Sequence, residues 1–174
     1  MNIFATGTVE IIGSDSELDR PAQVVANTNN AGNASNLTIN TSKLLLQSGG
    51  FVGASTTAGG NAGNVTINAT DSVEISGISP DNLTPSAVYS DGLIRSPAQQ
   101  QLFRLPPVPS GDSGNVTINT PRLSVRNGAL VSVRNQGTGN AGELRISAGS
   151  IFIANSGAIT ASTASGVGGN IQVR

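Results

Sequence analysis

The sequence predicts an all-β protein, a right-handed parallel β-helix (a solenoid) of about five rungs with three short strands per rung. Three observations lead to this fold class. A motif recurs at intervals of about 28 residues, short segments alternate strictly between apolar and polar residues, and no window shows the 3.6-residue apolar spacing of an amphipathic helix. With 174 residues, the chain has the length of a single domain.

The repeat is clearest in a short motif. Residues 63–68 read GNVTIN, residues 114–119 repeat this string, and weaker copies lie before and after these two. We therefore expect a single β-helix segment over residues 1–174, with rungs starting near 1, 36, 64, 115, 143 and 170. The unequal spacing of these starts predicts inserts at 13–21, 77–85 and about 91–110.

The unit that begins at residue 115 shows how each rung is built. Segments 115–119, 122–126 and 129–134 alternate between apolar and polar residues, which is typical of half-buried strands. Gly128 and the stretch 137–139 provide the corners. The residues expected to face the core are Val116, Ile118, Leu123, Val125, Ala129, Val131 and Val133.

Stacking of equivalent strands predicts a core made of aliphatic columns. The first strands contribute the columns Leu37, Val65, Val116, Leu144, Ile171 and Ile39, Ile67, Ile118, Ile146, Val173. The second strands contribute Val9, Leu44, Val73, Leu123, Ile151 and Ile11, Leu46, Ile75, Val125, Ile153. Every member is aliphatic, so no rung interrupts the predicted core.

The insert of the third coil is the best candidate for contact with a partner. Its central part, 94–108, contains several prolines and cannot belong to a strand ladder, so we expect a projecting loop with at most one helical turn. The residues expected to bind a partner are Arg95, Phe103 and Arg104. In the alternative interpretation, the apolar side chains of the insert lie down and cover one face of a sheet.

Composition excludes several classes of function. The chain has no Cys and no His, which excludes disulfides, thiolate or imidazole metal sites and nucleophile–histidine pairs. Its net charge of −1 and the lack of a basic block argue against nucleic acid as a partner. No apolar run reaches the 18 residues of a membrane span, and the N-terminal residues do not form a signal peptide. We expect no cofactor, no metal and no catalytic residue.

The strings GNVTIN, VEISG and RLSVRNGALVSV, in units of about 28 residues, resemble the filamentous-haemagglutinin-like exoproteins of two-partner secretion, in their cyanobacterial form. The resemblance covers essentially the whole chain and implies part of a long secreted passenger that crosses the outer membrane through a dedicated transporter. It also implies a secreted or cell-surface location and adhesion, with a surface glycan or another cell-surface polymer as partner. The Asn-Pro-Asn-Gly-type motif of the family's secretion module is missing here, so the chain resembles the repeat region of the passenger.

The alternative function is a carbohydrate-active or glycan-binding β-helix protein. Catalysis would need carboxylates that converge on one face. Glu10 and Glu74 fall in one outward column, about 9.6 Å apart by strand spacing, but Leu45 stands between them. The remaining acids scatter in turns: Asp15, Glu17, Asp19, Asp81, Asp91 and Asp112. We therefore expect a structural or adhesive segment and no enzyme.

Two further motifs have structural and functional interpretations. Residues 137–142 match the dinucleotide pattern G-x-G-x-x-G, but a strand follows in place of a helix, which favours a corner between strands. Asn36, Asn64, Asn115 and Asn170 form an outward column beside Thr38, Thr66 and Thr117. Such a ladder could bind ice or a repetitive polymer, whereas stacked Asn side chains bonding along the column are the structural alternative.

Neither end of the sequence shows a capping unit. The chain opens inside one predicted strand and stops inside another, and a bare terminal rung exposes core and unpaired strand edges. We expect both ends to be cut surfaces and the isolated chain to self-associate end to end.

Overall fold

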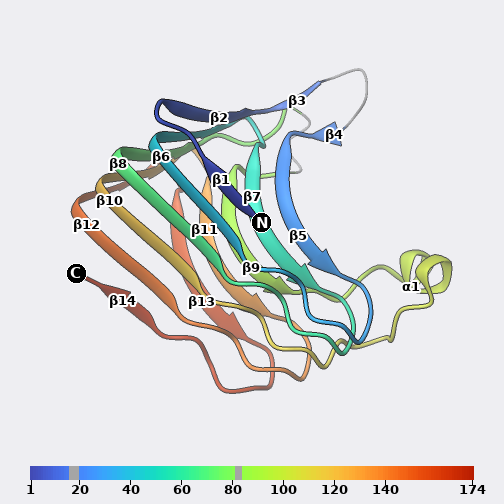
Figure 1. Ribbon diagram of the computed structural model, residues 1–174. Coiled ribbons are helices and arrows are strands. Elements are labelled where there is room, and N and C mark those ends of the chain that lie inside the picture. Colours follow the sequence, from blue (N-terminus) through green and yellow to red (C-terminus); the bar gives the residue numbers. More distant parts are fainter. Residues whose placement is uncertain (16–19, 81–83) are drawn as a thin grey trace.

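The computed structural model describes residues 1–15, 20–80 and 84–174, and this part of the chain is nearly all β-strand, with parallel strands in two main sheets (Figure 1). The seven-stranded sheet comprises β1 (Asn2–Phe4), β2 (Thr8–Ile12), β6 (Leu37–Gln47), β8 (Val65–Ser76), β10 (Val116–Arg126), β12 (Leu144–Ala154) and β14 (Ile171–Val173). The five-stranded sheet comprises β5 (Gln23–Thr28), β7 (Phe51–Thr56), β9 (Ala87–Gly92), β11 (Leu130–Asn135) and β13 (Ala158–Thr163). β3 (Ser14–Asp15) and β4 (Arg20–Pro21) form a small antiparallel pair.

The strand register agrees with the four predicted aliphatic columns. Ile118 pairs with Ile67 on one side and with Ile146 on the other. Further along the same strands, Val125 pairs with Ile75 and Ile153. Away from the ends of the stack these side chains are buried between the two sheets, and Ile118 is 0% exposed. Alternation of aliphatic and polar residues therefore determines which face of each strand enters the core.

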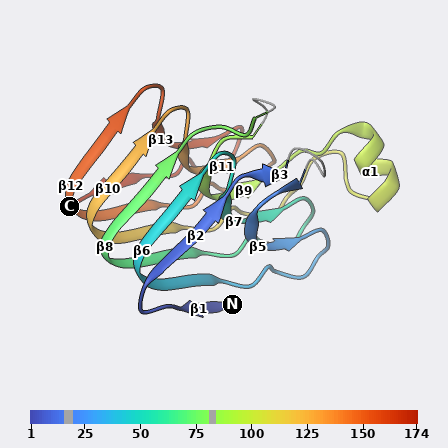
Figure 2. The same cartoon turned by 90° about the horizontal axis from the view of Figure 1, so that it is seen from above.

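The strands within a repeat differ from the prediction of three short ones. Predicted segments 115–119 and 122–126 belong to one long strand, β10, which bends in the middle, and the same is true of β6 and β8 (Figure 2). The pairing register shifts at this bend, between Asn119 and Arg122 in β10. The hydroxyl of Thr120 donates to the Arg122 carbonyl at 3.2 Å and so satisfies the backbone there. Each full repeat thus contributes one long bent strand and one short strand.

The insert after β9 contains a longer helix than predicted. α1 (Pro97–Phe103) has seven residues, where at most one turn was expected. Ser96 caps its N-terminus by accepting from the amide of Gln99, Pro97 occupies the first turn, and Arg104 ends it in the left-handed conformation with φ 53°. No residue of α1 is buried, and the helix projects from the body of the molecule (Figure 1). Among the described residues, no helix is long and apolar enough to cross a membrane.

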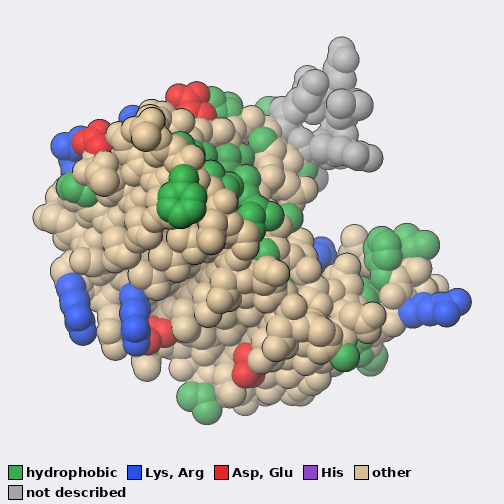
Figure 3. Space-filling model, in the orientation of Figure 1, with side chains coloured by type: hydrophobic (Ala, Val, Ile, Leu, Met, Phe, Trp, Pro, Cys, Tyr) green, Lys and Arg blue, Asp and Glu red, His purple; other side chains and the backbone are tan. Residues whose placement is uncertain are grey.

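Both ends of the stack present core-facing side chains to solvent. At one end Ile153, Ile171 and Val173 are 48%, 46% and 57% exposed, although their neighbours in the preceding strands are buried. At the other end, apolar side chains gather around β1, β2 and β5 (Figure 3), where Ile3, Val9 and Val24 are only partly buried. These open edges can pair with other strands.

We expect the isolated chain to associate through these edges. Sedimentation velocity at increasing concentration and moderate salt should show dimers and larger species. The double variant Ile171→Lys/Val173→Lys places charges on one edge and should shift the distribution toward monomer. A wild-type chain that stays monomeric at high concentration would contradict this expectation.

Candidate functional site

A groove on the outer face of the five-stranded sheet is the best candidate for a binding site. Alternation along the strands turns Val52, Val88 and Val131 into the core, so their neighbours face outward. The groove has a volume of about 210 Å³ and is open at the surface. Its lining comes from β7, β9, β11 and the approach to β9: Phe51, Thr84, Pro85, Ala87, Tyr89, Asp91, Leu130 and Arg134.

Two aromatic side chains form the apolar part of the groove. The rings of Phe51 and Tyr89 have centroids 5.6 Å apart and are inclined at 48°. Tyr89 is paired in register with Gly53, and a Cβ atom at Gly53 would overlap the Tyr89 ring. The glycine therefore lets the ring lie flat over β7. Two of the five aromatic residues in the chain are used here.

An ion pair between buried Asp91 and partly exposed Arg134 forms the polar part of the groove. Arg134 donates to Oδ2 of Asp91 at 3.0 Å, and the Asp91 side chain is 8% exposed. The other carboxylate oxygen, Oδ1, and the Arg134 Nε are buried and have no hydrogen-bond partner among the described residues. Burial raises the pKa of Asp91 to about 6, against the opposing influence of Arg134. Burial also raises the pKa of Tyr89 to about 12, with Asp91 adding to the rise and Arg95 opposing it.

The buried carboxyl predicts a pH-dependent stability. Ionised Asp91 disfavours the folded state above pH 6, and the folded chain takes up its proton as pH falls through 6, before the unfolded chain does near 3.8. This group should therefore raise the free energy of unfolding by roughly 1 kcal/mol between pH 7.5 and pH 5. Urea melts of wild type and Asp91→Asn at both pH values isolate the effect, because the variant cannot titrate there. An equal pH dependence in both proteins would contradict it. Arg134 is the charged group that acts on Asp91, and Asp91 and Arg95 act on Tyr89.

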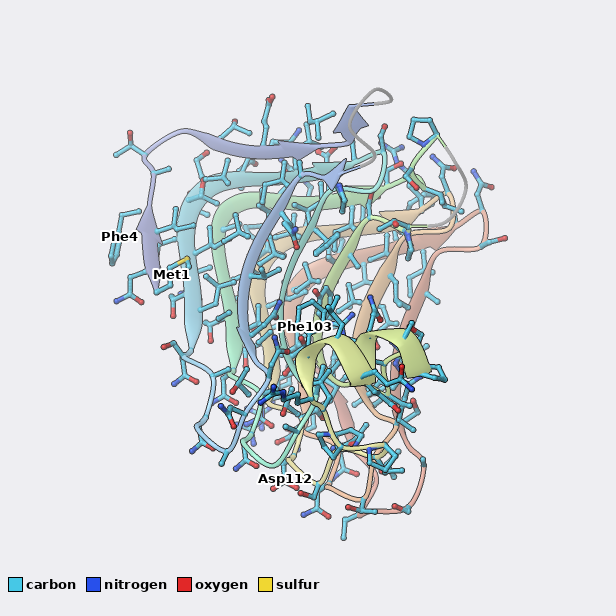
Figure 4. All side chains as sticks on the ribbon, turned by 90° about the vertical axis from the view of Figure 1, so that its right-hand side faces the viewer. Met1, Phe4, Phe103 and Asp112 are labelled. Carbon is cyan, nitrogen blue, oxygen red and sulfur yellow. The ribbon has the colours of Figure 1, made fainter. Side chains whose placement is uncertain are left out.

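The structure separates the three residues predicted to contact a partner. Arg95 is half-buried and close enough to Tyr89 for its charge to influence the hydroxyl. Phe103 and Arg104 lie at the C-terminal end of α1, where Phe103 is 58% exposed; Figure 4 labels Phe103 beside the helix, in front of the strands. The insert does not cover a sheet with its apolar side chains, because Ile94, Leu102 and Val108 are 45%, 74% and 45% exposed. Whether these residues bind a partner stays a prediction.

We expect the insert to be dispensable for folding. Gly92 pairs with Thr56, so Leu93 is aligned with Thr57, and Gly111 packs against Gly60. Both sides of the insert are thus aligned with residues of the preceding repeat. Deleting 94–108 leaves two residues between these points, as Ala58 and Gly59 do in that repeat. Far-UV circular dichroism should keep its β signal, with a small loss in melting temperature. Collapse of the signal would show that the insert belongs to the folding unit.

The described carboxylates do not converge on one face. Glu10 pairs in register with Leu45, and Leu45 pairs with Glu74, so the leucine separates the two acids. Glu74 contacts Lys43 at 2.7 Å, Asp71 bonds Arg122, and Glu143 contacts Arg145 at 2.5 Å. Among the described residues, no three His, Cys, Asp or Glu side chains could hold a metal ion. Of the acids predicted to lie in turns, Asp91 lies buried in β9, whereas Glu17, Asp19 and Asp81 lie outside the described residues.

The Asn column and the glycine motif have structural roles. The Asn36 side-chain oxygen accepts from the amide of Asn64 at 2.9 Å, and that of Asn64 accepts from Asn115 at 2.8 Å. Gly139 and Gly142, within the G-x-G-x-x-G match, pack against the carbonyls of Gly111 and Gly114 in the repeat before. A corner between strands, and not a nucleotide loop, is therefore what this motif forms. Arg145 interrupts the outward Thr column beside Thr117.

Sequence reasoning did not identify the groove. Its residues are far apart in the chain, from Phe51 to Arg134, and no motif links them. The available signal was the position of the rare aromatic residues. Once the short strand of the cleanest repeat is aligned with its equivalents, Phe51 and Tyr89 fall on outward positions of neighbouring strands. An outward aromatic pair on a protein with so few aromatic residues points to a binding surface.

Comparison with known proteins gives no relative. No protein-family model, no curated protein and no solved structure matches the chain. The likeness to filamentous-haemagglutinin-like exoproteins therefore rests on the repeat strings alone.

Proposed function

We propose that the chain is a structural and adhesive shaft segment of a large secreted or cell-surface β-helix exoprotein and performs no catalysis. The observation that carries the proposal is the in-register stacking of aliphatic side chains, with Ile39, Ile67, Ile118 and Ile146 in consecutive strands. A stack of this kind grows by adding repeats and builds an elongated body. The dispersed, mostly ion-paired carboxylates agree with a shaft better than with an enzyme.

The finer fold that we propose is a right-handed parallel β-helix of about five rungs, in which each full rung holds one bent strand and one short strand. Both main sheets follow the order of the repeats, as successive turns of one coil would. The Asn side chains that bond from one repeat to the next at the corners also support it.

Cysteine pairs test this stacking, because the chain has no cysteine of its own. Thr66 and Thr117 are directly paired, so Thr66→Cys/Thr117→Cys should form a disulfide on mild oxidation. Thr38 and Thr117 are two strands apart, about 9.6 Å, so Thr38→Cys/Thr117→Cys should keep both thiols free. Thiol counting by mass spectrometry separates the outcomes. Equal cross-linking of both pairs would exclude the proposed coil.

The proposed location is the cell surface or the surrounding medium, with export of the parent protein through an outer-membrane transporter. The resemblance of the repeat strings supports it, and a surface built mainly of uncharged polar groups is compatible with it, since only 11% of the residues are charged. An antibody raised against the chain should label intact cells of the source organism or detect the protein in the medium. Labelling that requires permeabilised cells would overturn the proposal.

A glycan-binding protein is the second candidate, and one observation favours it. The Phe51–Tyr89 pair beside the Asp91–Arg134 ion pair combines an apolar surface with polar groups in one groove. Small-ligand sites have this composition. Binding at the groove is compatible with an adhesive shaft, because the groove occupies one outward face and leaves the core columns untouched.

A further inference from the structure

We propose that the groove over β7, β9 and β11 binds one ring of a neutral polysaccharide. The inference rests on the proposed adhesive function and names its site and ligand class. Four side chains carry it: Phe51, Tyr89, Asp91 and Arg134. A sugar ring has an apolar C–H face and a rim of hydroxyl groups, and the groove offers a partner to each.

The apolar face of the sugar would lie on the aromatic pair. The Tyr89 ring is held flat over Gly53, and the Phe51 ring, inclined to it at 48°, forms a second wall. Pro85 and Leu130 complete an apolar rim around the small side chain of Ala87. The volume, about 210 Å³, is below the ~300–1,000 Å³ of sites for drug-sized ligands, so the groove suits a single ring of a longer chain.

The hydroxyl rim would meet the guanidinium group of Arg134, whose side chain is 42% exposed. Its Nη2 donates to Asp91 Oδ2 at 3.0 Å, which holds the group at the groove. Asp91 Oδ1 and Arg134 Nε are buried and lie out of reach of a ligand. The other N–H groups of the guanidinium can donate to neighbouring sugar hydroxyls. This complementarity is what a purely apolar ligand lacks.

The charges of the groove favour a neutral sugar over an acidic one. Arg134 is already paired with Asp91 at 3.0 Å, so its charge is compensated. Arg95 influences the Tyr89 hydroxyl but does not line the groove, and Asp91 would repel a uronate that lies beside Arg134. The larger groove of about 670 Å³ at the bend of the long strands is a weaker candidate. Its Asn68 and Asn119 side chains bond each other at 2.8 Å and leave fewer free groups.

Affinity electrophoresis of the full chain tests the proposal. The probes are three neutral polymers, hydroxyethyl cellulose, galactomannan and dextran, and one acidic polymer, polygalacturonate. At least one neutral polymer should retard the wild-type chain, and polygalacturonate should retard it less. Tyr89→Leu removes the ring, and Arg134→Lys removes the planar guanidinium while keeping the positive charge. Each should weaken retardation about tenfold.

Matched variants separate binding from folding. Tyr89→Phe keeps the ring and should keep retardation. Phe152→Leu removes an aromatic residue that is 59% exposed on the other sheet and should change nothing. If Tyr89→Leu lowers the melting temperature, its effect on binding cannot be separated from its effect on folding, and the retardation of Arg134→Lys then tests the proposal. No retardation by any neutral polymer, retardation by polygalacturonate alone, or full retardation of both Tyr89→Leu and Arg134→Lys would overturn the proposal.

The two proposals fail in different ways. If the antibody labels intact cells but no neutral polymer retards the chain, the proposed shaft function stands and the proposed ligand is wrong. If the chain binds a neutral polymer but the antibody labels only permeabilised cells, the proposed ligand stands and the proposed location is wrong.

Discussion

Replacing Ile118 with Asp is expected to lower the free energy of unfolding by about 4 kcal/mol or more. Ile118 is fully buried between Ile67 and Ile146, and the facing sheet closes the core above it. No cation or hydrogen-bond donor side chain belongs to the columns, so the new carboxylate would be buried without a partner. Urea denaturation followed by circular dichroism measures the loss, or shows that the variant no longer folds.

The neighbouring position provides the control. Thr117 faces outward from the same strand, beside Arg145 of β12, so Thr117→Asp places its charge in solvent near a cation. We expect a change within about 0.5 kcal/mol. If both variants lost the same stability, the assigned register of β10 would be wrong, because the two positions would not lie on opposite faces.

Gly111→Ala is expected to lower the free energy of unfolding by about 2–3 kcal/mol, although it adds only one methyl group at a corner between strands. Gly32, Gly60, Gly111, Gly139 and Gly166 form a column at one corner of the stack. A Cβ atom at Gly111 would overlap the Gly60 carbonyl oxygen, which belongs to the backbone and cannot turn aside. The two repeats would have to separate locally, and the decrease should appear in the urea midpoint.

The first glycine of the same column is the matched control. A Cβ at Gly32 would meet no atom within 4 Å, because no other repeat of the described residues stacks on that side. Gly32→Ala should be neutral or slightly stabilising through the unfolded state. An equal loss in both variants would assign the effect to the intrinsic preference for glycine at this corner and not to the contact between repeats.

The sequence predicts the structure well at positions that have the same role in every repeat. Alternation in each unit predicts the inward faces, and aligning the units predicts partners such as Val65 and Val116, which are paired in the structure. The bend of the long strands was not predictable in the same way. Thr120 and Pro121 indicate a break, but the Thr120 hydroxyl bonds to the Arg122 carbonyl and the strand continues. Pattern alone does not distinguish a bend from a break.

Features that occur once were harder to predict. The start of α1 carries a Ser-Pro signal typical of a helix N-terminus, at Ser96 and Pro97, but the prolines that follow the segment favoured a loop. The groove depends on side chains from three repeats, and its ion pair joins Asp91 to Arg134 across 43 residues. Periodicity reveals the residues that recur in every repeat, whereas the groove is formed by side chains that each occur in one repeat only.

The parallel pairing has a mechanical consequence for a chain held at its two ends. Hydrogen bonds between neighbouring strands run along the stack, for example from Leu37 to Asn64 and from Val65 to Asn115. Tension along this axis loads the junction between two repeats at a time, so strands detach in succession from the ends. Because each repeat contacts only its neighbours, we expect the remainder to stay folded while the chain lengthens stepwise. Each step would release the 27 or 28 residues of an ordinary repeat, or the 51 of the repeat with the long insert.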